Sequence, residues 1–261
     1  MQLTQAQCEA LERDGFLVLP GIFSGPEVDL IQARLPALFA EDHPGNIVER
    51  SSGSVRTSMG LQLRDPLIGA LVQHPRLIGP ALQILGEPAY IQQVKVNVKA
   101  AFSGEAWQWH YDFATHHAED GVPRPSALNL HIFLDDVSEF NGPLYFVPGS
   151  HRFGGLSTRL DSKTTSYPLW VCDRAEVAKL VERRGLVAAK GARGTMLIFH
   201  DTLVHGSPNN ISPWDRAIFS LIVNPIANAP QSPTRADHKH HQDLTAVAPL
   251  SDDCLAAPLI R

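Results

Sequence analysis

Cysteine is scarce in this chain. Its 261 residues include three cysteines, Cys8, Cys172 and Cys254, which lie far apart and are odd in number. Such a set does not form the disulfide framework of a secreted domain, and it suits free thiols in a reducing compartment. Cysteines so widely separated are also improbable as a metal site. If the protein binds a metal ion, nitrogen and oxygen atoms must hold it.

Long hydrophobic runs and clusters of basic residues are also missing. No apolar stretch has the length needed to cross a bilayer, and the beginning, MQLTQAQCEALERDG, lacks the basic-then-apolar order of a signal peptide. The 22 Lys and Arg residues against 27 Asp and Glu residues give a formal charge of −5. We therefore expect a cytoplasmic protein whose partner is a small molecule rather than nucleic acid or a membrane.

Residues 1–88 predict a mainly helical flank. An initial helix is followed by a short apolar strand over 16–20 and by a second helix that begins near Ser24. This second helix carries apolar side chains at helical spacing, namely Val28, Ile31, Leu35 and Leu38. Residues 41–58 are rich in Gly, Ser and charge, which predicts a loop, and helical patterns return over 67–85.

Residues 89–224 have the alternation of β-strands. YIQQVKVNV (90–98) and ALNLHIFLDD (127–136) alternate apolar and polar positions. Further short strands are expected over 144–147, 195–199 and 217–223, with a helix near 174–184. Short strands between Gly, Pro and Asn turns predict a mainly β protein with flanking helices and a jelly-roll, cupin-like core. We expect one domain over 1–261, with an irregular and partly mobile segment over 225–261.

A row of polar side chains follows one face of the strand over 90–98. Gln93, Lys95 and Asn97 project together, opposite the valines. They could face solvent, as the polar side of many antiparallel sheets does. They could also line an internal cavity, where polar groups orient a ligand. The alternation by itself leaves both interpretations open.

The stretch WQWHYDF (107–113) contains a histidine and an aspartate among aromatic rings. Aromatic residues favour a strand, in which His110 and Asp112 would lie side by side on one face. Such a pair is most often a solvated surface pair. It also supplies two of the three ligands of a facial triad, in which two histidines and one carboxylate hold ferrous iron and leave positions for substrate and dioxygen.

The third ligand must come from elsewhere in the chain. His205 is the best candidate, because an apolar strand ends there in the turn of FHDTLVHGSPNNISPWDR (199–216). His200 is an alternative, although it lies inside the apolar run. Arg216 opens the next apolar strand, and its planar guanidinium could hold a distant carboxylate. A metal ion and a basic group at a fixed distance suit a dicarboxylate that chelates iron at one end, as 2-oxoglutarate does.

Two other classes of protein could use the same ligands. A non-catalytic β-barrel could bind a metal or small ligand as a sensor or storage protein, but it would tolerate the loss of Asp112 or Arg216. A zinc hydrolase would use the three ligands and a bound water. It has no use for Arg216 at that distance, and no general base is evident beside the metal.

Taken together, these stretches resemble the phytanoyl-CoA dioxygenase (PhyH) family of iron(II)- and 2-oxoglutarate-dependent oxygenases. The resemblance covers nearly the whole chain and is carried by YIQQVKVN, WQWHYDF, EDGVPRPSALN, FLDDVSEFNGPLYFVPGSH, HGSPNNISPWDR and NPIANAP. The chain is most similar to the bacterial small-molecule branch, which includes ectoine hydroxylase and the free-leucine hydroxylase of griselimycin biosynthesis. The family implies a double-stranded β-helix.

The resemblance also implies roles for individual residues. It assigns iron(II) to three ligands, His110, Asp112 and His205. It assigns the distal carboxylate of 2-oxoglutarate to Arg216, with help from Ser207. Gln93 and Asn97 resemble polar positions of the family's inner wall, which favours the cavity for the polar row.

The implied reaction is the hydroxylation of a C–H bond. It consumes O2 and 2-oxoglutarate and gives succinate and CO2 as co-products. The related halogenases lack a carboxylate at the position of Asp112, so its presence favours hydroxylation. Desaturation or cyclisation, including that of a larger natural-product intermediate, is the alternative outcome of the same chemistry.

Four residues are candidates for contact with the primary substrate: His116, Arg235, Arg56 and Lys95. His116 lies in FATHHAEDGVPRP (113–125), which resembles the stretch that covers the substrate pocket of ectoine hydroxylase, at a position where that group has a tryptophan. Arg235 falls near the place of a substrate-gripping arginine in the leucine-hydroxylating relative. Arg56, in SVRTS, is a second candidate. An arginine closing over the site favours a small amino acid or another carboxylate as substrate, whereas DHKHH (237–241) is more typical of a solvated loop.

Overall fold

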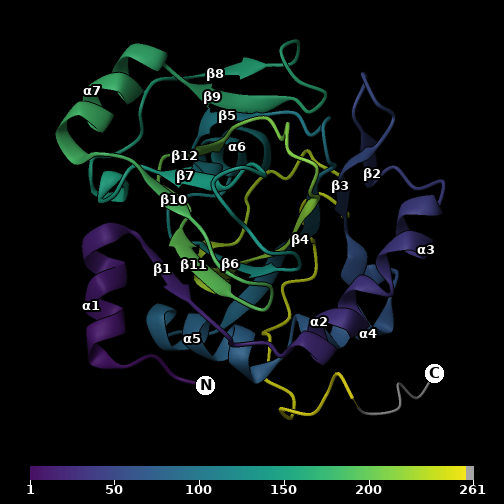
Figure 1. The fold of residues 1–261 in the computed structure, drawn as a ribbon. Helices are drawn as coiled ribbons and strands as arrows, with labels where there is room; N and C mark the ends of the chain where they lie inside the picture. Colours follow the sequence, from purple (N-terminus) through teal and green to yellow (C-terminus); the bar gives the residue numbers. More distant parts are fainter. Residues whose placement is uncertain (257–261) are drawn as a thin grey trace.

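The computed structural model describes residues 1–256 and contains two antiparallel sheets that enclose the centre of the molecule (Figure 1). The major sheet has seven strands in the order β1 (Phe16–Leu19), β11 (Met196–His200), β6 (Leu128–Phe133), β13 (Arg216–Pro225), β4 (Ala89–Lys99), β3 (Val55–Met59) and β2 (Asn46–Val48). The minor sheet has the order β10 (Val187–Ala189), β7 (Leu144–Phe146), β12 (His205–Ser207) and β5 (Trp107–His110). This is a jelly-roll, or double-stranded β-helix, core, and the predicted fold class is confirmed.

Helices cover the outer face of the major sheet (Figure 1). They are α1 (Gln5–Asp14), α2 (Gly25–Gln32), α3 (Leu35–Ala40), α4 (Pro66–Leu71) and α5 (Pro75–Leu85), with the short 3-10 helix η1 (Leu61–Leu63) before α4. Capping boxes fix the starts of α1 and α2, where Thr4 pairs with Gln7 and Ser24 pairs with Glu27. In residues 1–256 no helix is both long and apolar enough to span a membrane.

Further regular elements lie next to the minor sheet or, in the case of α6 (Asp112–Asp120), at the end of the space between the two sheets. These are α6, η2 (Ser150–Arg152), the hairpin of β8 (Thr158–Asp161) and β9 (Leu169–Cys172), and α7 (Arg174–Arg184). A small apolar cluster that includes Tyr111, Val147 and Val177 packs beneath α7. The 3-10 helix η3 (Ile226–Asn228) follows β13.

The alternation of β4 and β6 decides which side chains enter the main core. Val94 and Val96 of β4 and Leu130 of β6 point toward the helices and are fully buried there. The residues between them point toward the minor sheet, where Phe133 and Phe199 pack in a second cluster. Because successive side chains of a strand point to opposite faces, the polar row of β4 faces the space between the two sheets.

Three predicted elements differ from those observed. The expected loop over 41–58 contains the hairpin β2–β3, because Thr57 and Ser58 pair with Asn97 and Val96 of β4, and this pairing overrides a polar local composition. The expected helix from Ser24 is divided between α2 and α3. The strand expected through residue 113 ends at His110.

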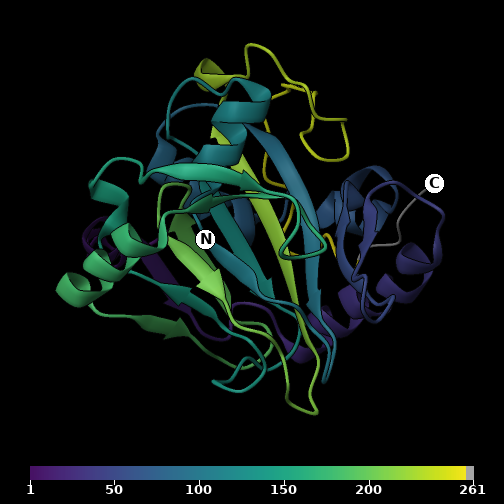
Figure 2. The same cartoon turned by 90° about the horizontal axis from the view of Figure 1, so that it is seen from above.

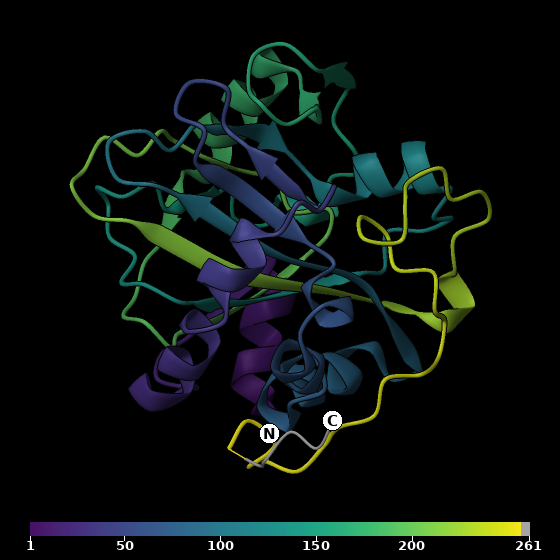
Figure 3. The same cartoon turned by 90° about the vertical axis from the view of Figure 1, so that its right-hand side faces the viewer.

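Between η3 and residue 256 the tail contains no helix or strand, but much of it is held in place by hydrogen bonds. Figures 2 and 3 show this yellow segment lying beside the teal helix α6. The backbone N–H groups of Gln231 and Thr234 donate to carbonyls of Gly121 and Glu119 at the end of α6. The N–H of His241 donates to the Gln92 carbonyl of β4. The segment from 231 to 241 therefore joins α6 to the edge of the cavity formed by β4.

Candidate active site

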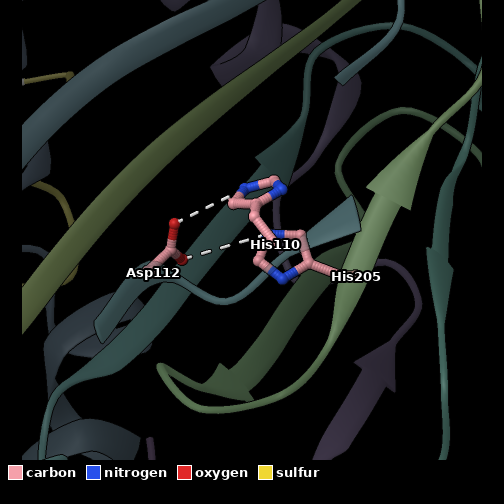
Figure 4. A group of neighbouring side chains, drawn as sticks. All are labelled: His110, Asp112 and His205. Atoms are coloured by element: carbon pink, nitrogen blue, oxygen red, sulfur yellow. Dashed lines mark ion pairs between the residues drawn. The ribbon is translucent and has the colours of Figure 1, made fainter. Parts of the chain in front are cut away.

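His110, Asp112 and His205 meet at one end of the space between the sheets (Figure 4). One nitrogen or oxygen of each lies within 4.8 Å of those of the other two, and all three residues are buried. Nε2 of His110 is 3.7 Å from one Asp112 oxygen, and Nε2 of His205 is 4.0 Å from the other. The two histidines are directly paired in register, because β5 and β12 are neighbouring antiparallel strands.

Asp112 reaches the two histidines from a helix rather than from a strand. Tyr111 is the extended N-cap residue of α6, and Asp112 is the first residue of the helix. A carboxylate is favourable in the first turn, where the helix dipole is positive. The predicted proximity of His110 and Asp112 is therefore found, but its predicted cause, a shared strand face, is wrong.

Each histidine is oriented by a carbonyl of its own chain segment. Nδ1 of His110 lies 2.6 Å from the Gln108 carbonyl oxygen, and Nδ1 of His205 lies 2.9 Å from that of Leu203. Each Nδ1 therefore carries the proton and donates it, which leaves Nε2 free as a ligand. Burial lowers the pKa of His110 to about 3 and also lowers the pKa of His205. At neutral pH the donor set is two neutral imidazoles and one carboxylate, which fits ferrous iron.

Arg216 lies in the same cavity and has no carboxylate partner among residues 1–256. Its side chain is buried, and its Nε and Nη2 groups donate to the Gly142 carbonyl at 3.2 and 3.0 Å. Nη2 also donates to the Ser207 hydroxyl at 3.2 Å, and that hydroxyl donates to the same carbonyl. Burial and the nearby Arg56 lower the pKa of Arg216 to about 9, so the guanidinium is still charged at neutral pH.

The polar row of β4 lines this cavity. Gln93, Lys95 and Asn97 are all on its wall, which is the second of the two interpretations that the alternation left open. The Gln93 amide donates to the Lys239 carbonyl of the tail at 2.6 Å and accepts from the Lys95 ammonium at 2.7 Å. The Asn97 carbonyl oxygen is buried without a partner in the described part of the chain.

Two of the predicted substrate contacts, His116 and Arg235, also line the cavity. His116 lies one turn after Asp112 on α6 and is 3% exposed, and its Nδ1 has no partner in residues 1–256. Arg235 comes from the tail and forms a bidentate ion pair with Asp120. The cavity therefore has basic side chains both near the triad and at the end formed by Arg216.

Arg56 is not part of the cavity wall. Its guanidinium is buried between Glu49 and Glu105, donates to the Ala106 carbonyl, and lies over the Trp107 ring at 4.0 Å. The charge of this guanidinium is already compensated by two carboxylates and an aromatic face, although its Nε is buried without a hydrogen-bond partner in the described residues. The structure therefore gives Arg56 a packing role and separates it from the other substrate candidates.

The other histidines considered from the sequence have local partners. His200 stacks on His151, with ring centroids 5.0 Å apart, and is not part of the triad. In the 237–241 stretch, His240 and His241 lie against Asp120 and Asp237 respectively.

Sequence reasoning missed Asp120, a fully buried carboxylate at the end of α6. One signal was available. An acidic residue directly before Gly121, the left-handed residue that ends the helix, opposes the negative end of the helix dipole. Such a position favours a nearby cation, but the sequence does not show that this cation is Arg235, because the two are far apart in the chain.

A jelly roll that holds a two-histidine, one-carboxylate triad and a buried arginine in one cavity has the architecture of an iron(II)- and 2-oxoglutarate-dependent oxygenase. The model of the phytanoyl-CoA dioxygenase (PhyH) family matches residues 11–218. The chain belongs to this family, and the resemblance seen in the sequence is confirmed.

Two curated relatives match over most of their length. L-proline trans-4-hydroxylase of Streptomyces griseoviridis is 36% identical over 253 residues, which cover 93% of this chain and 94% of that protein. Ectoine dioxygenase of Bordetella bronchiseptica is 36% identical over 266 residues, which cover 95% of this chain and 86% of that protein.

A solved structure agrees with both. The crystal structure of EctD from S. alaskensis with 2-oxoglutarate and 5-hydroxyectoine superimposes with a TM-score of 0.84 at 31% identity, covering 99% of this chain and 89% of that one. The chain is thus an iron(II)- and 2-oxoglutarate-dependent dioxygenase of the hydroxylase type, and its triad fits the iron.

Proposed function

We propose that this enzyme hydroxylates an unactivated C–H bond of a small amino-acid-like or other carboxylate metabolite. O2 and 2-oxoglutarate are the co-substrates, and succinate and CO2 are the co-products. His110, Asp112 and His205 bind the iron, and Arg216 with Ser207 binds the distal carboxylate of 2-oxoglutarate.

The observation that carries this proposal is the state of Arg216. It is a charged, buried guanidinium with one carbonyl and one hydroxyl as partners, on the wall of the cavity that contains the triad. A buried charge without a counter-ion is costly, and a carboxylate from a ligand would compensate it. A zinc hydrolase would leave this charge uncompensated. Asp112 is also the only carboxylate that the described part of the chain places on the cavity wall, so no second carboxylate there could act as the general base of a hydrolase.

The side chains of the cavity would bind and orient the substrate and the co-substrate, and they would exclude water. Iron with 2-oxoglutarate and O2 would supply the oxidising chemistry, in which the 2-oxo acid loses CO2 and one oxygen atom enters the substrate C–H bond. Gln108 and Leu203 fix the histidine tautomers through their carbonyls. Gln93 and Asn97 would position the co-substrate on the β4 side, where the Asn97 oxygen still lacks a partner.

The primary substrate would lie between α6 and the tail. Arg235 would bind its carboxylate, and His116 and Lys95 would contact its polar groups. The similarity to enzymes named for L-proline and ectoine supports a substrate of this size. Burial lowers the pKa of Lys95 and holds the pKa of His116 at about 3, so the imidazole is neutral and is able to accept or donate a hydrogen bond.

Anaerobic spectroscopy tests the oxygenase assignment. Addition of Fe(II) and then 2-oxoglutarate should produce the weak visible band of a chelated 2-oxo acid. Arg216→Ala should weaken 2-oxoglutarate binding by roughly 30-fold or more, since a buried charged hydrogen bond is worth about 2–5 kcal/mol. Arg216→Lys should recover part of the loss, and Arg159→Ala, at an exposed position of β8, serves as the control. A missing band, or one that Arg216→Ala does not change, would contradict the proposal.

The substrate class is tested by turnover. Free amino acids and related small acids are added one at a time, and the rate at which the enzyme forms succinate from 2-oxoglutarate is compared with the rate without added substrate. Release by at least one small carboxylate supports the class. A response limited to bulky acyl thioesters would show that the proposed class is wrong.

A further inference from the structure

Asp120 is a buried carboxylate close to the cavity, although it does not line it, and two basic side chains lie against it. The residue is fully buried at the last position of α6. Its oxygens accept from Arg235 Nε at 2.9 and 3.0 Å and also from Arg235 Nη2, and one of them lies 2.8 Å from Nδ1 of His240. Burial opposes ionisation, but the contacts with His240 and Arg235 dominate and lower the pKa of Asp120 to about 2. The group is therefore an anion inside the protein.

The pairing leaves a defined part of Arg235 for a ligand. Asp120 occupies the edge of the guanidinium formed by Nε and Nη2. The Nη1 group is not held by a carboxylate in the described residues, and Arg235 contributes to the cavity wall beside Tyr167. An arginine side chain has many rotamers, and a bidentate carboxylate selects one of them. Asp120 thus determines where the Nη1 group of Arg235 lies relative to the triad.

The ion pair of Asp120 with Arg235 also holds the C-terminal tail against α6. The segment from 231 to 241 is bonded to α6 at one end, through the carbonyls of Glu119, Asp120 and Gly121. At the other end Lys239 and His241 are bonded to Gln93 and Gln92 of β4. Figure 3 shows the tail following this path from α6 down the side of the molecule. Asp120 accepts hydrogen bonds from Arg235 and lies against His240, so one carboxylate contacts two side chains of the segment where it borders the cavity.

A contribution to stability alone does not explain why Asp120 and Arg235 occupy these positions. An acid at the C-terminal end of a helix opposes the dipole, and a buried ion pair is often no more stable than apolar packing. The arrangement has a use if the arginine must remain charged and accurately placed beside the cavity.

We propose that Asp120 is a positioning residue for substrate binding: it fixes Arg235 so that Nη1 meets the substrate carboxylate at a set distance from the iron ligands. This inference rests on the proposed function and deepens it. It defines the recognised group as a carboxylate of a small acid, held by a guanidinium whose other edge is already occupied.

The test compares acids with their amides in the full-length enzyme loaded with Fe(II). Free L-amino acids, L-proline included, are assayed beside their primary amides for succinate release. In the wild type the amide should be much the poorer substrate. Asp120→Asn should raise the KM of the acid at least ~10-fold and lower its kcat/KM on the order of 100-fold, because a small misplacement of a binding group has that effect. The KM for 2-oxoglutarate and the anaerobic band should stay unchanged.

The decisive reading is the acid-to-amide ratio. If Asp120 acts through Arg235, the preference for the acid shrinks in Asp120→Asn, and Asp120→Glu, which keeps the charge, retains part of it. If acid and amide lose activity by the same factor, Asp120 is merely structural and the inference is overturned. Thermal melting of each variant shows whether it is folded.

Asp237→Asn is the matched control. Its carboxylate lies in the same tail and contacts His241 and the Gln242 N–H, but it does not touch Arg235. It should leave the acid-to-amide ratio unchanged. If the wild type shows the iron band but responds to no small acid, the proposed substrate class fails and the inference falls with it. If the wild type prefers acids and Asp120→Asn matches it, only the inference fails.

Discussion

Among residues 1–256, Asp112 is the one carboxylate that lines the cavity, and its surroundings keep it ionised. Burial favours the protonated form, but His205, Lys95 and His110 outweigh it and hold the pKa of Asp112 well below its ordinary value. The same burial keeps the two histidines neutral. The three ligands therefore have the protonation states that a divalent cation requires, without prior loss of a proton at neutral pH.

Asp112→Asn should abolish tight iron binding while preserving the shape of the site. An amide has the same volume but no charge, so we expect Fe(II) affinity to fall by ~100-fold or more, since loss of an outer-sphere partner alone costs 10- to 100-fold. Anaerobic titration of the apoprotein with Fe(II) measures the change. Affinity within a few-fold of wild type would show that the metal is held elsewhere.

Ser207→Ala should have a much smaller effect than Arg216→Ala. The hydroxyl accepts from Arg216 and donates to Gly142, so its loss removes neutral or singly charged hydrogen bonds worth about 1 kcal/mol. We expect the KM for 2-oxoglutarate to rise about fivefold with little change in kcat. Steady-state kinetics at saturating substrate measures it. A rise in KM as large as that caused by Arg216→Ala would mean that Ser207 contributes as much to 2-oxoglutarate binding as Arg216 does.

At the scale of the elements, the turn before β11 has no room for a side chain at Gly194. Gly194 has a φ of +84°, and a Cβ atom there would lie 2.0 Å from the Phe23 carbonyl oxygen. Gly194→Ala combines backbone strain with a collision that a rigid backbone cannot relieve, so it should lower the free energy of unfolding by about 3 kcal/mol or more.

Gly154→Ala separates the two causes. Gly154 has a similar φ of +69°, but its Cβ would meet open space. This variant should lose only about 1 kcal/mol, which is the cost of the left-handed backbone alone. Urea denaturation of both variants compares them. Equal losses would contradict the collision at Gly194.

Strand positions were predictable where local pattern and tertiary role agree. The valines of β4 and leucines of β6 alternate because one face packs on helices, and that period is readable in the sequence. The β2–β3 hairpin was not predictable, because its polar residues become strand only by pairing with β4. The end of β5 at His110 was likewise hidden, since aromatic content favours a strand through residue 113.

The candidate site was predictable to the extent that its residue types are unusual. The sequence indicates His110 and Asp112 as a ligand-type pair among aromatic residues, and His205 and Arg216 as residues at the end of one apolar strand and the start of the next. The fold brings all four into one cavity. The sequence does not distinguish Arg56, which is outside the cavity wall, from Arg235, which is part of it. Whether a buried arginine faces a cavity or two carboxylates depends on contacts between distant parts of the chain.

The folded molecule as a whole should be sensitive to acid through histidines such as His200, which is half-buried. Burial, followed by the neighbouring His151, lowers the pKa of His200 to about 4. The unfolded chain takes up this proton near pH 6.5. The unfolded state therefore binds more protons between these values, and stability is lost as the pH falls from about 6.5 to 4.

His200→Phe should reduce this loss. Phenylalanine has a ring of similar size that does not titrate. Its presence should remove up to about 3 kcal/mol from the change in the free energy of unfolding over this pH range. Urea denaturation of the iron-free protein at pH 7.5, 5.5 and 4.5 measures the slope, and His241→Phe, in the tail, is the control. An unchanged slope in His200→Phe would show that other groups dominate acid unfolding.

Because the strand register places His205 opposite His110, binding of the iron ion should affect the stability of the fold as well as catalysis. These residues belong to strands that are neighbours in space and distant along the polypeptide, and Asp112 begins a helix attached to one of them. A cation shared by the three behaves as a removable cross-link between the middle of the chain and its last quarter. Iron supply would then govern the lifetime of the folded enzyme as well as its activity.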